Sequence, residues 1–121
     1  MSAVPVFRVQ DADGRGPYKP GTSHRWCDKS GPPPPPTFME EFGDRLFSMM
    51  DRFPHNGCAF ASLLQLQAWF TPAEQGRLNQ LGYRIVRFRP DRIIASSEHQ
   101  LVVQRAKPFA EIADHVPWPS A

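Results

Sequence analysis

The chain has 121 residues, of which 40% are hydrophobic and 14 are proline, and its formal net charge is +2. This length predicts a single domain over residues 1–121, with one modest core and a good deal of extended loop. So small a positive charge does not suggest a protein that coats DNA generally, which would usually carry a stronger basic block. Eleven of the 14 basic residues are arginines, however, and guanidinium groups suit a binding site for phosphate.

The sequence also bears on compartment and on metals. Its start, MSAVPVFRVQ, does not resemble a signal peptide, and no run approaches the roughly 20 apolar residues that cross a bilayer. We therefore expect a cytoplasmic chain with no membrane partner, in which Cys27 and Cys58 stay reduced. The four histidines are scattered, and none lies at ligand spacing from a cysteine or another histidine. No metal site is predicted.

The first predicted element is a strand over residues 4–10, VPVFRVQ, with Val6 and Arg8 on one face. A long loop rich in glycine and proline follows over residues 11–36. Loops of this length inside a compact domain are usually functional or disordered. Within it, Pro32–Pro36 must form an extended polyproline segment, which we interpret as a rigid spacer in preference to an SH3-type ligand.

Three helices are predicted after this loop. Residues 37–53 begin with a Thr-Phe-Met-Glu capping box and carry apolar residues at helical spacing. A second helix is expected over residues 62–70, with Ser62 as its N-cap. The third follows directly: Thr71 is the N-cap, a proline and a glutamate occupy the first and third helical positions, and the glycine at 82 ends the helix.

The rest of the chain favours extended structure. Strands are predicted over residues 83–88, 92–96 and 100–105, and the Asn-Gly pair at 56–57 is predicted to form a turn. The tail over residues 108–121 is expected to form a short helix docked on the body. Because the strands are segregated from the helices, the order indicates an α+β fold with small mixed or antiparallel sheets.

Several polar residues are candidates for a site, and each also has a structural explanation. Arg8 interrupts an apolar strand, and Arg15 lies in a glycine-bearing loop whose amides could approach a phosphate. Phe60 and Ser62 could simply be the hydrophobic staple and the cap of the second helix. The Glu-His-Gln sequence at 98–100 could be no more than a hairpin tip.

Together these pieces resemble the ADP-ribosyltransferase superfamily, in its Arg–Ser–Glu branch. That branch has an arginine on the first strand, an aromatic-x-Ser element in the middle, and a Glu/Gln-x-Glu/Gln pair that opens a late strand. More narrowly, VFRVQDADGRGPY, GCAFASLLQLQAWF and GYRIVRFRP with the downstream glutamine look like a group of short proteins from phages and bacteria. The resemblance covers most of the chain between Val6 and Arg105, apart from the proline-rich insert.

The resemblance implies a compact ADP-ribosyltransferase-like fold and NAD as the donor substrate. Arg8 would correspond to the arginine that holds the NAD phosphate and ribose. Phe60 and Ser62 would match the aromatic-x-Ser element, in which the serine orients the catalytic side chain. Glu98 and Gln100 would form the pair whose second member is normally the catalytic glutamate, which opposes the positive charge of an oxocarbenium-like transition state.

The chain departs from this pattern at Gln100, where a carboxylate is expected. An amide can still donate to or accept from a ribose hydroxyl, but it carries no charge to oppose the developing cation. Losing one such electrostatic interaction typically lowers a rate about a hundredfold or more. Either Glu98 takes the role through a shifted geometry, or the chain binds without turnover.

Three hypotheses follow. The first is a mono-ADP-ribosyltransferase that modifies a protein or nucleic-acid target. The second is a catalytically silent relative that binds and inhibits a partner protein, for example a phage-encoded inhibitor of a host defence system, through exposed residues such as Tyr18 or Trp26. The third is a structural domain in which Arg8 and Gln100 are incidental. The target and the oligomeric state stay open at this point.

Overall fold

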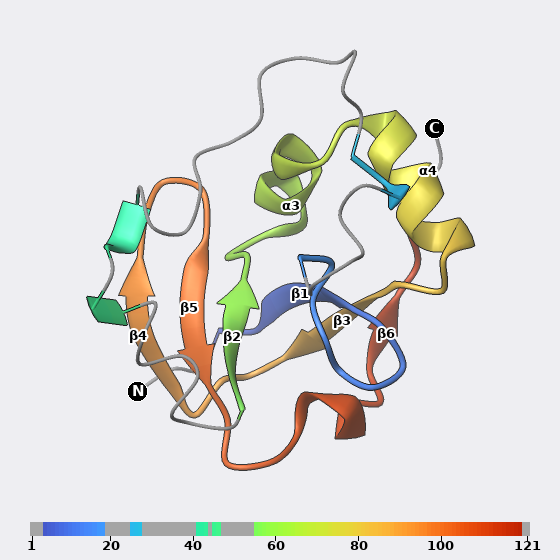
Figure 1. Ribbon diagram of the computed structural model, residues 1–121. Helices are drawn as coiled ribbons and strands as arrows, with labels where there is room; N and C mark the ends of the chain where they lie inside the picture. The colour runs from blue at the N-terminus through green and yellow to red at the C-terminus, as the bar shows by residue number, and fades with distance from the viewer. Residues whose placement is uncertain (1–3, 19–24, 28–40, 44, 47–54, 120–121) are drawn as a thin grey trace.

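The computed structural model describes residues 4–18, 25–27, 41–43, 45–46 and 55–119 (Figure 1). In this part of the chain the elements are, in order, β1 (Val6–Gln10), β2 (Asn56–Ala59), α3 (Leu63–Trp69), α4 (Pro72–Gln80), β3 (Arg84–Phe88), β4 (Arg92–Ser96), β5 (Leu101–Gln104), a 3₁₀ turn (Phe109–Glu111) and β6 (His115–Val116). The predicted α+β class is confirmed, with two α-helices among the described residues in place of the three that were expected. None of the helices described is long and apolar enough to cross a membrane.

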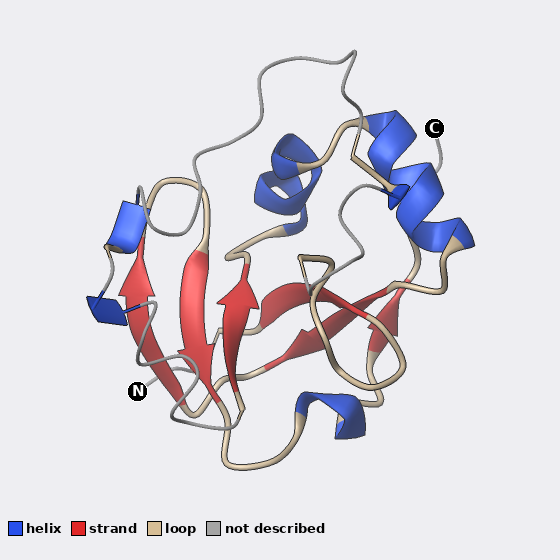
Figure 2. Ribbon diagram, in the orientation of Figure 1, coloured by secondary structure: helices blue, strands red, loops and turns tan. Residues whose placement is uncertain are grey.

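The strands form two antiparallel sheets of three strands each, in the orders β1-β3-β6 and β2-β5-β4. Figure 2 shows the strands of one sheet running across those of the other. The two sheets meet at Phe7 and Phe60, which form an isolated antiparallel bridge. The amide of Phe7 donates to the carbonyl of Phe60 at 2.9 Å, and the reverse bond is 2.7 Å long. This bridge joins the first strand to the segment that leads into α3.

The sheet β1-β3-β6 is buried on both faces, because alternate residues of a strand point in opposite directions. On one face its apolar residues pack against the sheet β2-β5-β4 and the 3₁₀ turn, in a cluster of Val6, Ala59, Val86, Phe88, Leu101, Val103, Phe109 and Ile112. On the other face they pack against the helices, in a cluster of Val9, Trp26, Phe60, Leu66, Phe70, Leu78, Tyr83 and Ile85. Arg8 and Val6 therefore share the face that looks toward the second sheet.

Both helices begin and end where the sequence predicts. The Oγ of Ser62 accepts from the amide of Gln65 at 3.1 Å and so caps α3. At the start of α4, Thr71 and Glu74 form a complete capping box, with bonds of 2.9 and 3.1 Å. Gly82 follows α4 with φ of +91°, a left-handed conformation that favours glycine.

Gly76 lies inside α4, and a Cβ added there would meet no atom within 4 Å. Glycine in a helix interior is less favourable than alanine by about 0.5–1 kcal/mol, because it loses more conformational freedom on folding. We expect Gly76→Ala to raise the free energy of unfolding by that amount in urea denaturation. Gly82→Ala, in a left-handed residue, should lower it. A loss of stability in both variants would contradict the prediction.

Two expectations are corrected. The Asn-Gly pair at 56–57 is part of β2 and pairs with Gln104 and Val103 of β5, so the predicted turn there is wrong; the left-handed residue is His55, with φ of 72°. The tail forms a 3₁₀ turn and a two-residue strand rather than one docked helix. Pairing with strands far along the chain decides both, and no local pattern signals it.

Most of the predicted first helix, 37–53, lies outside the described residues, as does the Pro32–Pro36 segment. Residues 41–42 and 45–46 are helical. Between them Gly43 has φ of +86°, which a continuous α-helix does not accommodate. The expected uninterrupted helix is therefore wrong at this position.

Candidate functional site

Arg8 is buried, with only 7% of its surface exposed, and its guanidinium binds the chain itself. Its Nε donates to Oε1 of Gln10 at 3.1 Å, and its Nη1 donates to the carbonyl of Cys58 at 2.9 Å. Its Nη2 donates to the carbonyl of Gly14 at 3.0 Å. The guanidinium also lies over the ring of Phe109, 4.3 Å from its centroid. All three nitrogens are thus engaged inside the fold.

The contacts of Arg8 connect three parts of the molecule. They join β1 to β2 through Cys58, to the following turn through Gly14, and to the 3₁₀ turn through Phe109. Gln10 extends the same network, because its Nε2 donates to the carbonyl of Phe109 at 2.8 Å. Burial lowers the pKa of Arg8 to about 10, so the guanidinium is still charged at neutral pH. Three of the five guanidinium N–H groups are thus used inside the fold, and the low exposure of Arg8 leaves little room for a phosphate to reach it.

The hydrogen-bonding groups of the glycine-bearing turn after β1 are also used within the chain. The Oδ1 of Asp11 accepts from the amides of Asp13 and Arg15, both at 3.0 Å, and the amide of Gly14 donates to the Asp11 carbonyl. Gly14 has φ of +82°, and an added Cβ would lie 2.6 Å from the backbone nitrogen of Ala110. The close approach that this glycine permits is therefore to the 3₁₀ turn. Arg15 is exposed to solvent.

Ser62 has the structural role that was weighed against the functional one, and Phe60 is part of the core. Phe60 is buried in the helix-side core, with its ring centroid 5.7 Å from that of Trp69 and 6.2 Å from that of Phe70. Ser62 is exposed and caps α3. Because Phe60 and Arg8 lie on opposite faces of the sheet β1-β3-β6, the Arg8 guanidinium does not face the aromatic-x-Ser element.

The turn over residues 97–100 lies beside the start of α3. Gln65 makes this connection: its Oε1 accepts from the amide of Ala61 at 2.8 Å, and its Nε2 donates to the carbonyl of Glu98 at 2.8 Å. The structure thus brings together the elements that contain Ser62 and Glu98, two of the predicted site residues. The Glu98 side chain is exposed, whereas Gln100 is buried.

Glu41 lies at the centre of this region, and sequence reasoning missed it. Its Oε1 accepts from Nε2 of Gln100 at 2.7 Å, and its Oε2 lies 2.9 Å from Nδ1 of His99. Burial alone would raise the pKa of Glu41, but hydrogen bonds from Ser97, His99 and Gln100 outweigh it and hold the pKa below its usual value. The charge that Gln100 lacks is therefore supplied next to it by a residue 59 positions earlier.

Aromatic residues flank this carboxylate. The ring centroids of Trp69 and His99 are 6.5 Å apart, and Nε1 of Trp69 donates to the hydroxyl of Tyr18 at 2.9 Å. We call Tyr18, Glu41, Trp69, His99 and Gln100 the Glu41 cluster. It contains acid–base groups and an aromatic surface, and the hydrogen bonds of the predicted phosphate anchor, Arg8, go to Gln10, Cys58 and Gly14 instead of to this cluster.

Trp26 was expected to be exposed, and this expectation is wrong. Only 1% of its surface is exposed, and its Nε1 donates to the carbonyl of Pro17 at 3.0 Å. Its ring packs edge-on against Tyr18 at 5.2 Å and against Phe70 at 5.4 Å. Trp26 therefore supports Tyr18 from beneath instead of forming the surface.

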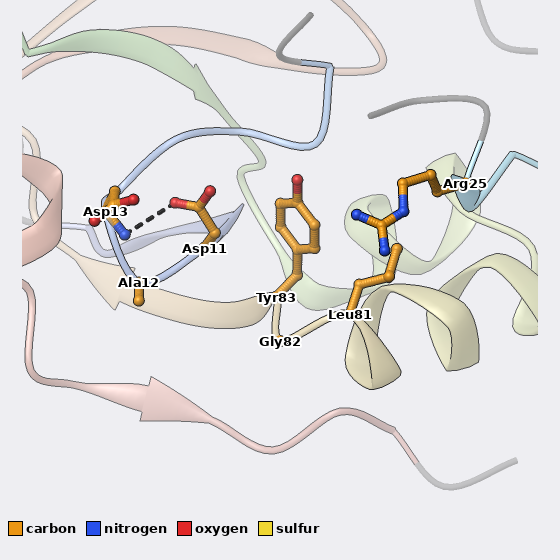
Figure 3. A pocket seen from close by; sticks show the side chains of 7 residues that line it. All are labelled: Asp11, Ala12, Asp13, Arg25, Leu81, Gly82 and Tyr83. Atoms are coloured by element: carbon orange, nitrogen blue, oxygen red, sulfur yellow. Dashed lines mark hydrogen bonds between the residues drawn. The ribbon is translucent and has the colours of Figure 1, made fainter. Parts of the chain in front are cut away.

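A separate pocket lies beside the turn after β1 (Figure 3). Its volume is about 280 Å³, and it is lined by Asp11, Ala12, Asp13, Arg25, Leu81, Gly82 and Tyr83. Figure 3 shows the Tyr83 ring between the Asp11 and Arg25 side chains. None of the predicted site residues lines this pocket. Among the described residues, no group of three His, Cys, Asp or Glu side chains is placed to hold a metal ion.

Comparison with known families places the chain. Residues 1–115 match the sequence model of the family described as Bacteriophage T4 Y00F protein. The chain belongs to this family. Membership supports the expected association with phages, and it gives no support to the resemblance to ADP-ribosyltransferases. No curated protein and no solved structure matched the chain.

In this family member, the sequence offered no signal for Glu41. It sits in a segment expected to be helical, next to another glutamate, and nothing within four residues of it distinguishes it from a solvated side chain. Its partners His99 and Gln100 are 58 and 59 positions away. Only the packing of its segment against the 97–100 turn identifies it.

Proposed function

We propose that the protein acts by binding a partner protein, without catalysing a reaction. Such a protein could serve a phage as an inhibitor of a host protein. The observation that carries this proposal is the engagement of Arg8 by Gln10, Cys58 and Gly14. An ADP-ribosyltransferase needs its first-strand arginine for the donor phosphate. Here that arginine binds Gln10, Cys58 and Gly14 inside the fold, and this engagement supports a role in stability over a role in holding NAD.

The Tyr18 side of the Glu41 cluster is the surface that suits a protein partner. Tyr18 is 56% exposed, and its hydroxyl is held by Trp69 while Trp26 supports its ring. Tyrosine and tryptophan are enriched at the centres of protein interfaces, where they bury a large area with little loss of side-chain entropy.

The binding test uses the tagged full-length chain to isolate partners from a phage-susceptible host. A partner should co-purify at a fixed stoichiometry and be identified by mass spectrometry. Tyr18→Ala should weaken its binding by about tenfold or more, as is typical of an aromatic residue at the centre of an interface. Ile93→Ala is the matched control, because Ile93 is also an exposed apolar residue (44%) but lies on β4. Equal loss in both variants would contradict the proposed surface.

The absence of catalysis is tested separately with NAD. A ligand that binds only the folded state raises the melting temperature. We expect no shift at millimolar NAD and no transfer of label from labelled NAD to the chain or to its isolated partner. Transfer by the wild-type chain would overturn the proposal, whatever the result of the binding experiment.

One observation favours a second function, ADP-ribosyl transfer. The Glu41 carboxylate lies 2.7 Å from the Gln100 amide, so a negative charge is present beside the position predicted to be catalytic. Low pKa keeps that carboxylate ionised at neutral pH. In this alternative the Glu41 carboxylate would oppose the positive charge that develops on the ribose. Gln100 would orient the carboxylate and the ribose through hydrogen bonds.

The alternative predicts label transfer from NAD that Glu41→Gln lowers about a hundredfold or more. Glu98→Gln serves as the control, because the Glu98 side chain is exposed and only its carbonyl joins the network. If Glu98→Gln abolishes transfer and Glu41→Gln does not, then Glu98 is the working carboxylate. If the wild-type chain transfers no label, neither Glu41 nor Glu98 is a catalytic carboxylate.

A further inference from the structure

The arginines of this chain are not spread evenly. Arg8 is buried and Arg87 is bound to Asp114, with Nε 2.9 Å from Oδ2. Another group lies at one end of the sheet β2-β5-β4, in the turn before β4, at the first residue of β4 and in the segment after β5. Its members, which we call the basic corner, are Arg89, Arg92, Arg105 and Lys107.

Backbone bonds hold the two segments of the basic corner together. Arg92 is the register partner of Gln104, and the amide of Asp91 donates to the Gln104 carbonyl at 3.0 Å. The amide of Ala106 donates to Oδ2 of Asp91 at 2.6 Å. Residues 89–92 and 104–107 are therefore fixed beside one another by β pairing and by one capping carboxylate, so the two basic segments lie side by side.

The charge at this corner is largely uncompensated. Arg105 is held in place, because its Nη1 donates to the Pro108 carbonyl at 2.6 Å and its guanidinium lies 5.8 Å from the Phe88 ring centroid. Arg89, Arg92 and Lys107 are exposed, and in the described part of the chain none of them forms an ion pair. Asp91 is the one acidic residue within the two segments.

We propose that the basic corner binds the phosphate backbone of a nucleic acid. Three of its four cations are guanidinium groups, whose planar donors match phosphate oxygens in pairs. Clustered positive charge without an aromatic centre suits a polyanion better than it suits a protein partner, whose interface needs an apolar core. The inference does not depend on partner binding at Tyr18, because the residues of the two surfaces do not overlap.

The test measures fluorescence anisotropy of a labelled 20-nucleotide single strand with the full-length chain at 50–200 mM NaCl. The double variant Arg89→Gln/Arg92→Gln should weaken binding at least about tenfold at the lowest salt and flatten the slope of log K against log salt by about one to two. Arg15→Gln/Arg84→Gln removes the same charge from exposed positions outside the corner. This control should keep most of the affinity and slope.

Three results would overturn the proposal. One is the absence of binding in 50 mM NaCl at tens of micromolar protein. Another is an equal loss in the two double variants, which would indicate general charge attraction rather than a site. The third is that polyglutamate displaces the labelled strand as effectively as an unlabelled strand of equal charge does. That result would indicate that the basic corner binds an acidic protein surface instead of a nucleic acid. Melting temperatures of both variants, measured in parallel, separate lost binding from lost folding.

Discussion

Arg8→Met should lower the free energy of unfolding by about 3–5 kcal/mol, the largest single effect we expect in this chain. Methionine keeps much of the buried aliphatic volume, but it cannot donate to Gln10, Cys58 or Gly14. Their oxygens would stay buried without these donors, and each lost bond to a charged donor typically costs about 1.5–3 kcal/mol, less when several are lost together. Urea denaturation followed by tryptophan fluorescence measures the change.

Arg84→Met is the matched control for this prediction. Arg84 is an arginine of the same sheet, exposed on β3 opposite Gln10, and replacing it should change stability by less than about 0.5 kcal/mol. If Arg8→Met were equally mild, the guanidinium would not be holding the fold together, and Arg8 would again become available as a ligand-binding residue.

The second large effect is expected at Gly14. Gly14→Ala should cost about 2–4 kcal/mol, because it combines a left-handed backbone with a steric overlap. The added Cβ would lie 2.6 Å from the nitrogen of Ala110 and 3.1 Å from the carbonyl carbon of Phe109, both backbone atoms that cannot rotate away. The turn would have to move off the 3₁₀ segment, taking with it the carbonyl that accepts from Arg8.

A comparison with Gly82 separates the cost of the left-handed backbone at Gly14 from the cost of the steric overlap. Its φ of +91° is close to that of Gly14, at +82°, yet nothing lies within 4 Å of an added Cβ. Gly82→Ala should therefore show only the left-handed cost of about 1–2 kcal/mol. Thermal unfolding of the two variants compares them directly. Equal melting temperatures would mean that the contact between Gly14 and Ala110 contributes little.

These effects bear on how the Arg–Ser–Glu resemblance should be understood. The arginine, the serine and the glutamine each have a defined task inside the fold: Arg8 joins β1 to β2, Ser62 caps α3, and Gln100 anchors Glu41. A pattern of three residues can thus arise from structural needs alone. Membership in the Bacteriophage T4 Y00F protein family is consistent with a phage role and leaves the chemistry to the experiments above.

Local sequence was sufficient for much of the fold. The caps at Ser62 and Thr71 and the stop at Gly82 were predicted, and the structure confirms all three. Most strands were also predicted, because their alternating β-branched residues signal extended backbone. β2 was missed because its sequence, NGCA, contains turn residues and no such alternation, and it becomes a strand only by pairing with β5.

For this protein the sequence by itself determined where α3, α4 and the strands β1, β3, β4 and β5 lie, since caps and periodicity depend on residues within about four positions of one another. It also identified Arg8 and Gln100 as unusual. Only the tertiary structure decided what they do, because the carbonyl of Cys58 lies 50 positions from Arg8 and the carboxylate of Glu41 lies 59 positions from Gln100. A buried polar group must find a partner, but the one it finds depends on which distant segments the core brings together.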